Sequence, residues 1–260
     1  MMKALMINAL LLLAFAALMV QAPEASAALT VKANHDRLDV DYNYHGGAVS
    51  VSGEADPGVE LIIKIASPSG EEELMRKDRV GGILWMNTEK VEFGGVPGVY
   101  YLASTRTPEE ILETSHRMAN GIGYDALAET AEITGHSNPE ARGALFDEFI
   151  KYKEAKRLFS RSAGDVAVKP DADGQAYRTV FQWPYQAPPG RYIVTAYAVK
   201  DGAVVDKAET EVHVQQVGVV KLLADMAQNR GGLYGLVAVV IALAAGFGVG
   251  MLFRTGGGAH

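Results

Sequence analysis

The sequence predicts a mainly β protein: an immunoglobulin-like β-sandwich with a helical insertion, plus one C-terminal transmembrane helix. Apolar residues recur at every second position from residue 28 to about 104 and again beyond Gly164, as strands with one buried face require. Helical spacing replaces this pattern from about 107 to 162. An uncharged run of 21 residues, 233–253, is long enough to cross a bilayer.

Composition limits the classes of function. The 260 residues are 48% apolar and 21% charged, which suits one or two folded domains. Because 24 Lys and Arg face 31 Asp and Glu, the formal charge is −7, and no basic stripe is present. A nucleic-acid partner is therefore not expected, since phosphate contacts need clustered positive charge. The lack of Cys excludes disulfides, thiolate metal sites and Cys nucleophiles.

The N-terminus has the pattern of a signal peptide. Lys3 precedes an uncharged apolar run over 9–20, and Ala25-Ser26-Ala27 has the small-x-small form of a cleavage site. We predict that residues 1–27 are removed and that the mature chain begins at Ala28. The alternative is an uncleaved signal anchor, although the apolar run is short for a membrane span.

Turn residues separate the early strands, for example at 56–58, 67–70 and 97–98. The alternating apolar residues of two early strands are Leu38, Val40, Tyr42 and Tyr44, and Val59, Leu61, Ile63 and Ile65. The helical insertion begins where Thr107 can cap a helix, Pro108 fits its first position and Glu110 can bond back to the cap. The spacing then predicts three helical segments, over 108–119, 124–134 and 139–160.

The strand pattern returns after the insertion. Residues 177–183 alternate, and two strands over 191–199 and 203–214 flank Asp201-Gly202, a strong hairpin signal. These late strands would lack partners in a separate α domain. We therefore predict one extracytoplasmic β-sandwich domain over residues 28–215.

The C-terminal part is predicted to contain two helices. Residues 216–232 should form a juxtamembrane amphipathic helix, whose apolar face carries Val219, Leu222, Leu223 and Met226. This helix could lie on the outer leaflet, pack under the β domain or contact a partner. Residues 233–253 should cross the lipid bilayer, leaving residues 254–260 as a cytoplasmic tail, an orientation that follows from the signal peptide.

Small residues recur every four positions within this span, at Ala238, Ala242, Gly246 and Gly250. Such a stripe allows another helix backbone to approach closely, which is how many membrane helices associate. We interpret these four residues as a helix-packing face for an integral membrane protein or a second copy of this chain. The alternative is a simple anchor, because Gly and Ala are common in membrane helices.

No catalytic, cofactor or metal site is predicted. The sequence has no GxSxG elbow, phosphate-binding Gly loop or dinucleotide fingerprint, so we do not expect an enzyme. The histidines show no short metal-ligand spacing, although His35 with Asp36 could approach His45 across strands. Asp171 and Gly174 suit a plain turn better than a calcium loop. The charge run over 71–79 suits a solvated hairpin.

Four aromatic residues on predicted strands are expected in the core; they are Trp85, Tyr100, Tyr101 and Trp183. Two segments near them, residues 79–87 (RVGGILWMN) and 91–104 (VEFGGVPGVYYLAS), resemble the middle of the alphaproteobacterial putative transmembrane family. The order of elements is also similar. This resemblance implies a bacterial inner-membrane protein with its main domain in the periplasm. It also implies an accessory role near a transporter, because members of the family often lie beside permeases of the sulfite-exporter type.

Two functions are consistent with these features. The first is a non-enzymatic, single-pass membrane protein whose periplasmic domain binds or modulates a membrane partner. The alternative is a membrane-tethered periplasmic module that binds a ligand or a metal.

Overall fold

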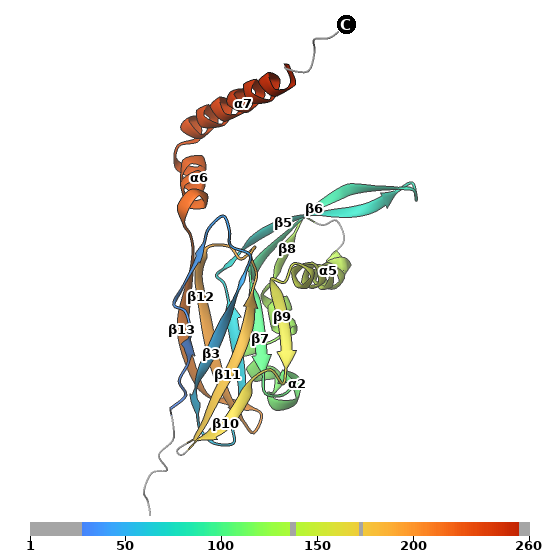
Figure 1. The fold of residues 1–260 in the computed structure, drawn as a ribbon. Helices are drawn as coiled ribbons and strands as arrows, with labels where there is room; N and C mark the ends of the chain where they lie inside the picture. Colours follow the sequence, from blue (N-terminus) through green and yellow to red (C-terminus); the bar gives the residue numbers. More distant parts are fainter. Residues whose placement is uncertain (1–27, 136–138, 172–173, 255–260) are drawn as a thin grey trace, which may run out of the picture.

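A computed structural model describes residues 28–135, 139–171 and 174–254. The predicted signal peptide, Asn138, the 172–173 turn and residues 255–260 of the tail lie outside these ranges. The described chain is mainly β, with several sheets, short helices and one long apolar C-terminal helix. Figure 1 shows two layers of strands face to face, with a hairpin arm and two consecutive helices leaving the same end.

The first layer, sheet A, has the order β1–β3–β11–β10 and is antiparallel throughout. Its strands are β1 (Lys32–Ala33), β3 (Gly47–Ala55), β10 (Ala167–Asp171) and β11 (Gly174–Trp183). The long pairing of β3 with β11 joins strands from before and after the insertion. This pairing confirms that the late strands complete the early sheet.

The second layer, sheet B, has the order β2–β13–β12–β4–β7–β9. Its strands are β2 (Arg37–Val40), β4 (Glu60–Ala66), β7 (Tyr100–Ser104), β9 (Phe159–Ala163), β12 (Gly190–Lys200) and β13 (Ala203–Gln216). The predicted hairpin between β12 and β13 is confirmed, with Asp201 and Gly202 both at positive φ (51° and 80°). The predicted alternation through Tyr42 is wrong, because β2 ends at Val40 and Tyr42 is exposed.

The core between the sheets joins aliphatic residues of β4 and β12 to aromatic residues of β7 and β11. Tyr101 stacks on Phe181 and meets Trp183 edge-on, with ring centroids 6.0 and 6.2 Å apart. Trp183 also packs edge-on against Tyr192, at 4.8 Å. These contacts confirm that Tyr101 and Trp183 belong to the core.

The insertion is less helical than predicted. Its helices are α2 (Pro108–Ile111), α3 (Thr114–Ala119), α4 (Tyr124–Thr130) and α5 (Arg142–Ala155), with a 3₁₀ turn at Pro139–Ala141. The predicted 108–119 helix breaks where Leu112 turns extended and bridges to Gly202. The capping box does not form, since the side chain of Thr107 makes no capping hydrogen bond.

Two strands occupy the ends of the other predicted helices. Residues Glu132–Thr134 form β8, and Phe159–Ala163 form β9, which pairs in parallel with β7. An open sheet edge supplies backbone hydrogen bonds that outweigh the local helical pattern.

The insertion covers the outer face of sheet B, so β4 is buried on both faces. The Tyr100 hydroxyl donates to the Gly121 carbonyl (3.1 Å) and accepts from the Gly123 amide (2.9 Å), holding the α3–α4 connection. Lys64 donates to the Asn120 carbonyl at 2.5 Å. Burial, reinforced by the charge of Lys207, lowers the pKa of Lys64 to about 8.

The hairpin arm consists of β5 (Ser69–Val80) and β6 (Leu84–Pro97), which prolong β4 and β7 beyond the sandwich; with β8 they form a third sheet. Helix α5 packs against the base of the arm, where Phe149 stacks on Phe93 at 4.3 Å. The solvated hairpin is confirmed, but placing Trp85 in the core is wrong. Trp85 is 61% exposed because it pairs with Arg79 near the turn of the hairpin. Figure 1 shows no second layer of strands over this part of the arm.

Helix α5 also contributes a buried cation. The Lys153 side chain is 1% exposed, and its ammonium lies 2.5 Å from a carboxylate oxygen of Glu72. The same ammonium lies 5.4 and 5.3 Å from the ring centroids of Phe149 and Phe159. Lys153 therefore connects the arm, α5 and β9 at one point.

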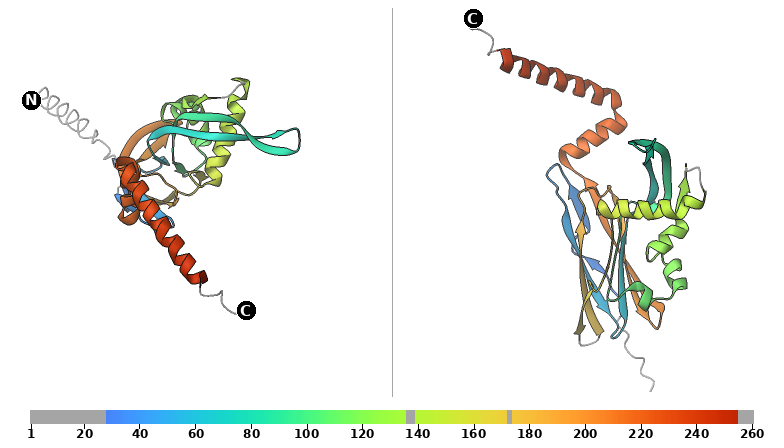
Figure 2. Two further views of the ribbon diagram at one scale, coloured as in Figure 1. Left: turned by 90° about the horizontal axis from the view of Figure 1, so that it is seen from above. Right: turned by 90° about the vertical axis from the view of Figure 1, so that its right-hand side faces the viewer.

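Two helices follow the sandwich: α6 (Gly218–Asn229) and α7 (Gly231–Arg254). None of the residues of α6 is buried, so its apolar face does not pack under the β domain. Within the described chain, Gly231–Met251 is the one helix long and apolar enough to cross a membrane. The right-hand view in Figure 2 shows α6 and α7 standing clear of the sandwich.

We predict that Glu72→Ala destabilises the protein by about 3 kcal/mol, because it leaves the Lys153 ammonium buried without its counter-charge. Lys153→Met should cost about 1 kcal/mol or less, since the partly exposed Glu72 can be hydrated. Urea unfolding of the full-length protein in detergent measures both changes. Glu73→Ala is the control, because its ion pair with Lys90 is exposed and worth little. Equal losses for Glu72→Ala and Glu73→Ala would contradict the role of the buried pair.

Candidate functional site

The α6 end of the sandwich, where β13 ends and α6 begins, carries three exposed features: helix α7, a pocket and the tip of the arm. On α7, the predicted helix-packing residues Ala238, Ala242, Gly246 and Gly250 are all exposed. Their four-residue spacing places them on one slowly turning stripe of the helix. A Cβ added at Gly246 or Gly250 would meet no atom within 4 Å. The described chain therefore provides no packing partner for this stripe.

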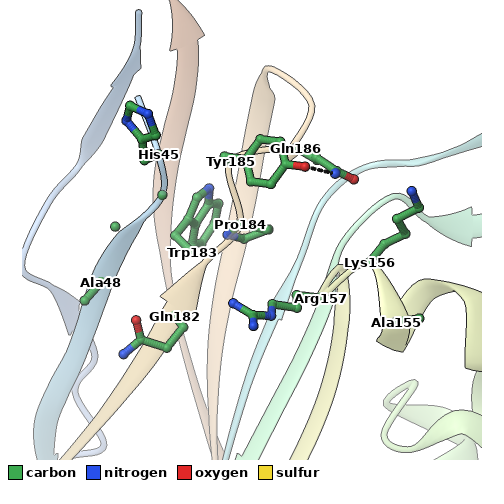
Figure 3. Close-up of a pocket in the computed structure, with 12 residues that line it drawn as sticks. His45, Ala48, Ala155, Lys156, Arg157, Gln182, Trp183, Pro184, Tyr185 and Gln186 are labelled. Carbon is green, nitrogen blue, oxygen red and sulfur yellow. Dashed lines mark hydrogen bonds between the residues drawn. The ribbon is translucent and has the colours of Figure 1, made fainter. Parts of the chain in front are cut away.

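The pocket lies beside the last residues of β11 and has a volume of about 630 Å³. Three segments line it: the start of β3, the C-terminal end of α5, and the end of β11 with the loop that follows (Figure 3). The lining residues are His45, Gly46, Gly47, Ala48, Ala155, Lys156, Arg157, Gln182, Trp183, Pro184, Tyr185 and Gln186.

The pocket lining is cationic and rich in hydrogen-bond donors. Lys156 and Arg157 supply two positive charges, and the twelve lining residues include no Asp or Glu. The indole nitrogen of Trp183, a residue 2% exposed, is buried without a hydrogen-bond partner in the described structure. Figure 3 shows this nitrogen on the side of the ring that faces His45 and Tyr185. Such a lining suits an anion or another hydrogen-bond acceptor.

Backbone geometry holds Arg157 at the pocket. Arg157 adopts a left-handed conformation (φ 56°) directly after α5. Its amide donates to the Glu154 carbonyl at 2.8 Å, and its own carbonyl accepts the Tyr101 hydroxyl at 2.6 Å. Burial raises the pKa of Tyr101, so this hydroxyl remains a donor at neutral pH. A core residue of β7 thus fixes the chain that presents Arg157.

The opposite wall depends on a glycine. Gly46 has φ 106°, and a Cβ on it would lie 2.8 Å from the Trp183 carbonyl oxygen. Only glycine fits there without strain, so the start of β3 can lie close to the end of β11. The Tyr44 hydroxyl is buried nearby, without a hydrogen-bond partner in the residues described, and burial raises its pKa.

The structure does not assemble a metal centre from the described residues. It contains no group of three or more His, Cys, Asp or Glu that could hold a metal ion, in the parts of the chain that are placed. His35, Asp36 and His45 are therefore not brought together as ligands. The Nδ1 atom of His45 instead lies 2.5 Å from the Asn43 carbonyl oxygen.

Sequence reasoning did not single out Lys153, Lys156 or Arg157. Lys156 and Arg157 fall within the predicted 139–160 helix, so their place beyond the end of α5 was not apparent. Lys153 could have been identified from its position four residues after Phe149, on the apolar face of the predicted helix. A cation buried on such a face needs a counter-charge or hydrogen-bond acceptors.

Comparisons with known proteins identify the family but not an activity. No curated protein matches the chain significantly. Among solved structures, domain 1 of VCBP3 from Branchiostoma floridae is similar to 74% of this chain, with 96% of that domain covered. The sequence identity is 11% and the TM-score 0.25, so this similarity carries no argument about function. The family described as putative transmembrane protein (Alph_Pro_TM) matches residues 28–255. The chain therefore belongs to this transmembrane protein family, as residues 79–87 and 91–104 indicated.

Proposed function

We propose that this protein is a non-enzymatic, single-pass accessory protein of a bacterial inner membrane, which binds or modulates a membrane partner. The observation that carries the proposal is the unpartnered stripe of small residues along α7. Family membership supports the membrane location. A permease of the sulfite-exporter type is the candidate partner that the family resemblance implies.

The sandwich would act as the periplasmic part of this accessory protein. We propose that it is immunoglobulin-like, a reading supported by two facing sheets, a closing β12–β13 hairpin and an aromatic core around Trp183. Such sandwiches present loops at their ends for recognition. Here the α6 end carries the pocket and the arm, which would place both toward the membrane and the partner.

We predict that the mature protein begins at Ala28 and that its C-terminus is cytoplasmic. Removal of residues 1–27 leaves α7 as the single span, with the domain before it outside the cytoplasm. Mass spectrometry of the membrane-bound protein should find Ala28 at the N-terminus. A reporter fused after His260 should be active in the cytoplasm. An intact Met1 start would contradict cleavage.

The helix-packing role is tested by Gly246→Leu and Gly250→Leu. A bulky side chain should hold the partner backbone away and remove dispersion contacts, at a cost on the order of 1 kcal/mol or more in association. Crosslinking or co-purification of the full-length protein from native membranes measures the association. A polytopic protein recovered with the wild type should be depleted with both variants.

Two substitutions off the stripe serve as matched controls. Val240→Leu and Leu243→Ile retain the length and hydrophobicity of the span, so association should be unchanged at equal expression. If all four variants associate equally with the partner, α7 is an anchor alone and the stripe has no packing role.

Ligand binding is a second candidate function, favoured by the cationic pocket at the α6 end. Lys156 and Arg157 could bind an anion there, with the Trp183 indole as an additional donor after a small movement of its neighbours. The absence of a metal-ligand group among the described residues favours an anion over a metal ion. In this function the membrane helix would only tether the module.

Inorganic sulfate or phosphate, at ionic strength matched with chloride, tests the pocket. We expect either anion to raise the melting temperature of the full-length protein in detergent, because a ligand that binds only the folded state stabilises it. Arg157→Gln should abolish the rise, and Lys151→Gln, which removes an exposed cation of α5 outside the pocket, should retain it. A rise that persists in Arg157→Gln would place the anion elsewhere.

A further inference from the structure

The distal part of the β5–β6 arm has a contiguous exposed apolar tip. Four large side chains follow one another at residues 83–86, and Ile83 and Trp85 are 88% and 61% exposed. Gly81 and Gly82 turn the chain at positive φ (66° and 74°), with no atom within 4 Å of an added Cβ. Exposed apolar surface on a projecting tip indicates an interaction site.

The chemistry of the tip matches the interface of a lipid bilayer. Residues 80–88 contain no charged side chain, and the residues just outside this run carry both signs: Lys77 and Arg79 flank Asp78, and Glu89 precedes Lys90. The Arg79 guanidinium lies 5.1 Å from the centroid of the Trp85 ring. Trp is enriched at the headgroup level, and Arg beside it can bind lipid phosphates. A lipid surface therefore suits the apolar tip and Arg79, whose guanidinium lies against Trp85.

The arm leaves the sandwich at the end that continues through α6 into α7. Figure 1 shows the arm and α6 leaving the same end of the sandwich. At this end Gly190, paired with Val214 of β13, lies beside Pro68 at the base of the arm. The 12 residues of β5 extend about 40 Å at ~3.3 Å per residue. The 12 residues of α6 span about 18 Å. The arm is thus longer than the helix that separates the sandwich from α7.

We propose that residues 80–86 at the tip of the arm insert into the outer leaflet of the bilayer that α7 spans. This second anchor would fix the orientation of the sandwich on the membrane surface and hold the pocket end toward the lipid. The inference rests on the proposed membrane anchoring by α7 and is independent of whether α7 binds a partner.

Fluorescence quenching tests this insertion directly, because the protein has two tryptophans and Trp183 is buried in the sandwich. The full-length protein is reconstituted into phosphatidylethanolamine and phosphatidylglycerol vesicles, with and without acyl-chain-brominated lipid. We expect brominated lipid to quench most of the Trp85 emission in the wild type. The Trp85→Phe variant, which retains only Trp183, should lose little emission.

Charge variants separate insertion from general association with vesicles. Leu84→Asp should abolish the quenching of Trp85, whereas Val205→Asp should not, because Val205 is an exposed residue of β13 near its far turn. If Trp85 in lipid vesicles stays open to aqueous iodide and unquenched by brominated lipid, the proposal is wrong. Protection from iodide only in native membranes would also overturn it, and would indicate a protein partner for the tip. The α7 variants are tested in a separate crosslinking experiment. A finding that the stripe of small residues has no packing role would therefore leave this test of insertion unaffected.

Discussion

The ion pair between Lys153 and Glu72 constrains how the arm, α5 and β9 meet outside the sandwich. A buried ammonium is tolerated only when a counter-charge and polarisable neighbours surround it. Here Glu72 comes from the arm, whereas Phe149 and Phe159 come from α5 and β9, two consecutive elements that lie far from the arm in the sequence. Because the cation can be satisfied only when all three meet, it favours one arrangement of α5 over any other apolar packing.

This contact extends a second core outside the sandwich. The outer face of sheet B would be solvated in a simple two-layer sandwich, but Tyr100 and Phe159 point from it toward α4 and α5, with ring centroids 5.8 Å apart. Phe149 continues the same cluster to Phe93 of the arm. The arm is therefore rigid at its base, where aromatic packing holds it, and unsupported toward its tip.

The sequence was informative where burial is local and failed where a tertiary neighbour decided the outcome. The alternation of residues 177–183 and the Asp201-Gly202 turn specified β11 and the closing hairpin, because strand pleat and positive φ are properties of the chain itself. Phe159 continued a helical pattern but joined a strand, since the edge of β7 offered hydrogen bonds. Trp85 followed a strand pattern too, yet no second layer covers it. Of the candidate site, the stripe on α7 could be predicted from spacing, whereas the pocket could not, because its three walls are far apart in the sequence.

The exposure of α6 adds a constraint on how these parts work together. Its apolar face finds no cover in the described domain, so α6 gains stability only against lipid or another protein. A free hinge at residues 230–231 would let the sandwich tilt about a single span. If the apolar α6 face and the apolar arm tip both meet the bilayer as proposed, they would add two contacts with the membrane plane to the span itself, and three points define an orientation. With these contacts the surface of the sandwich itself would not have to touch the membrane, so the outer face of sheet A would stay in water while the pocket end lay near the lipid.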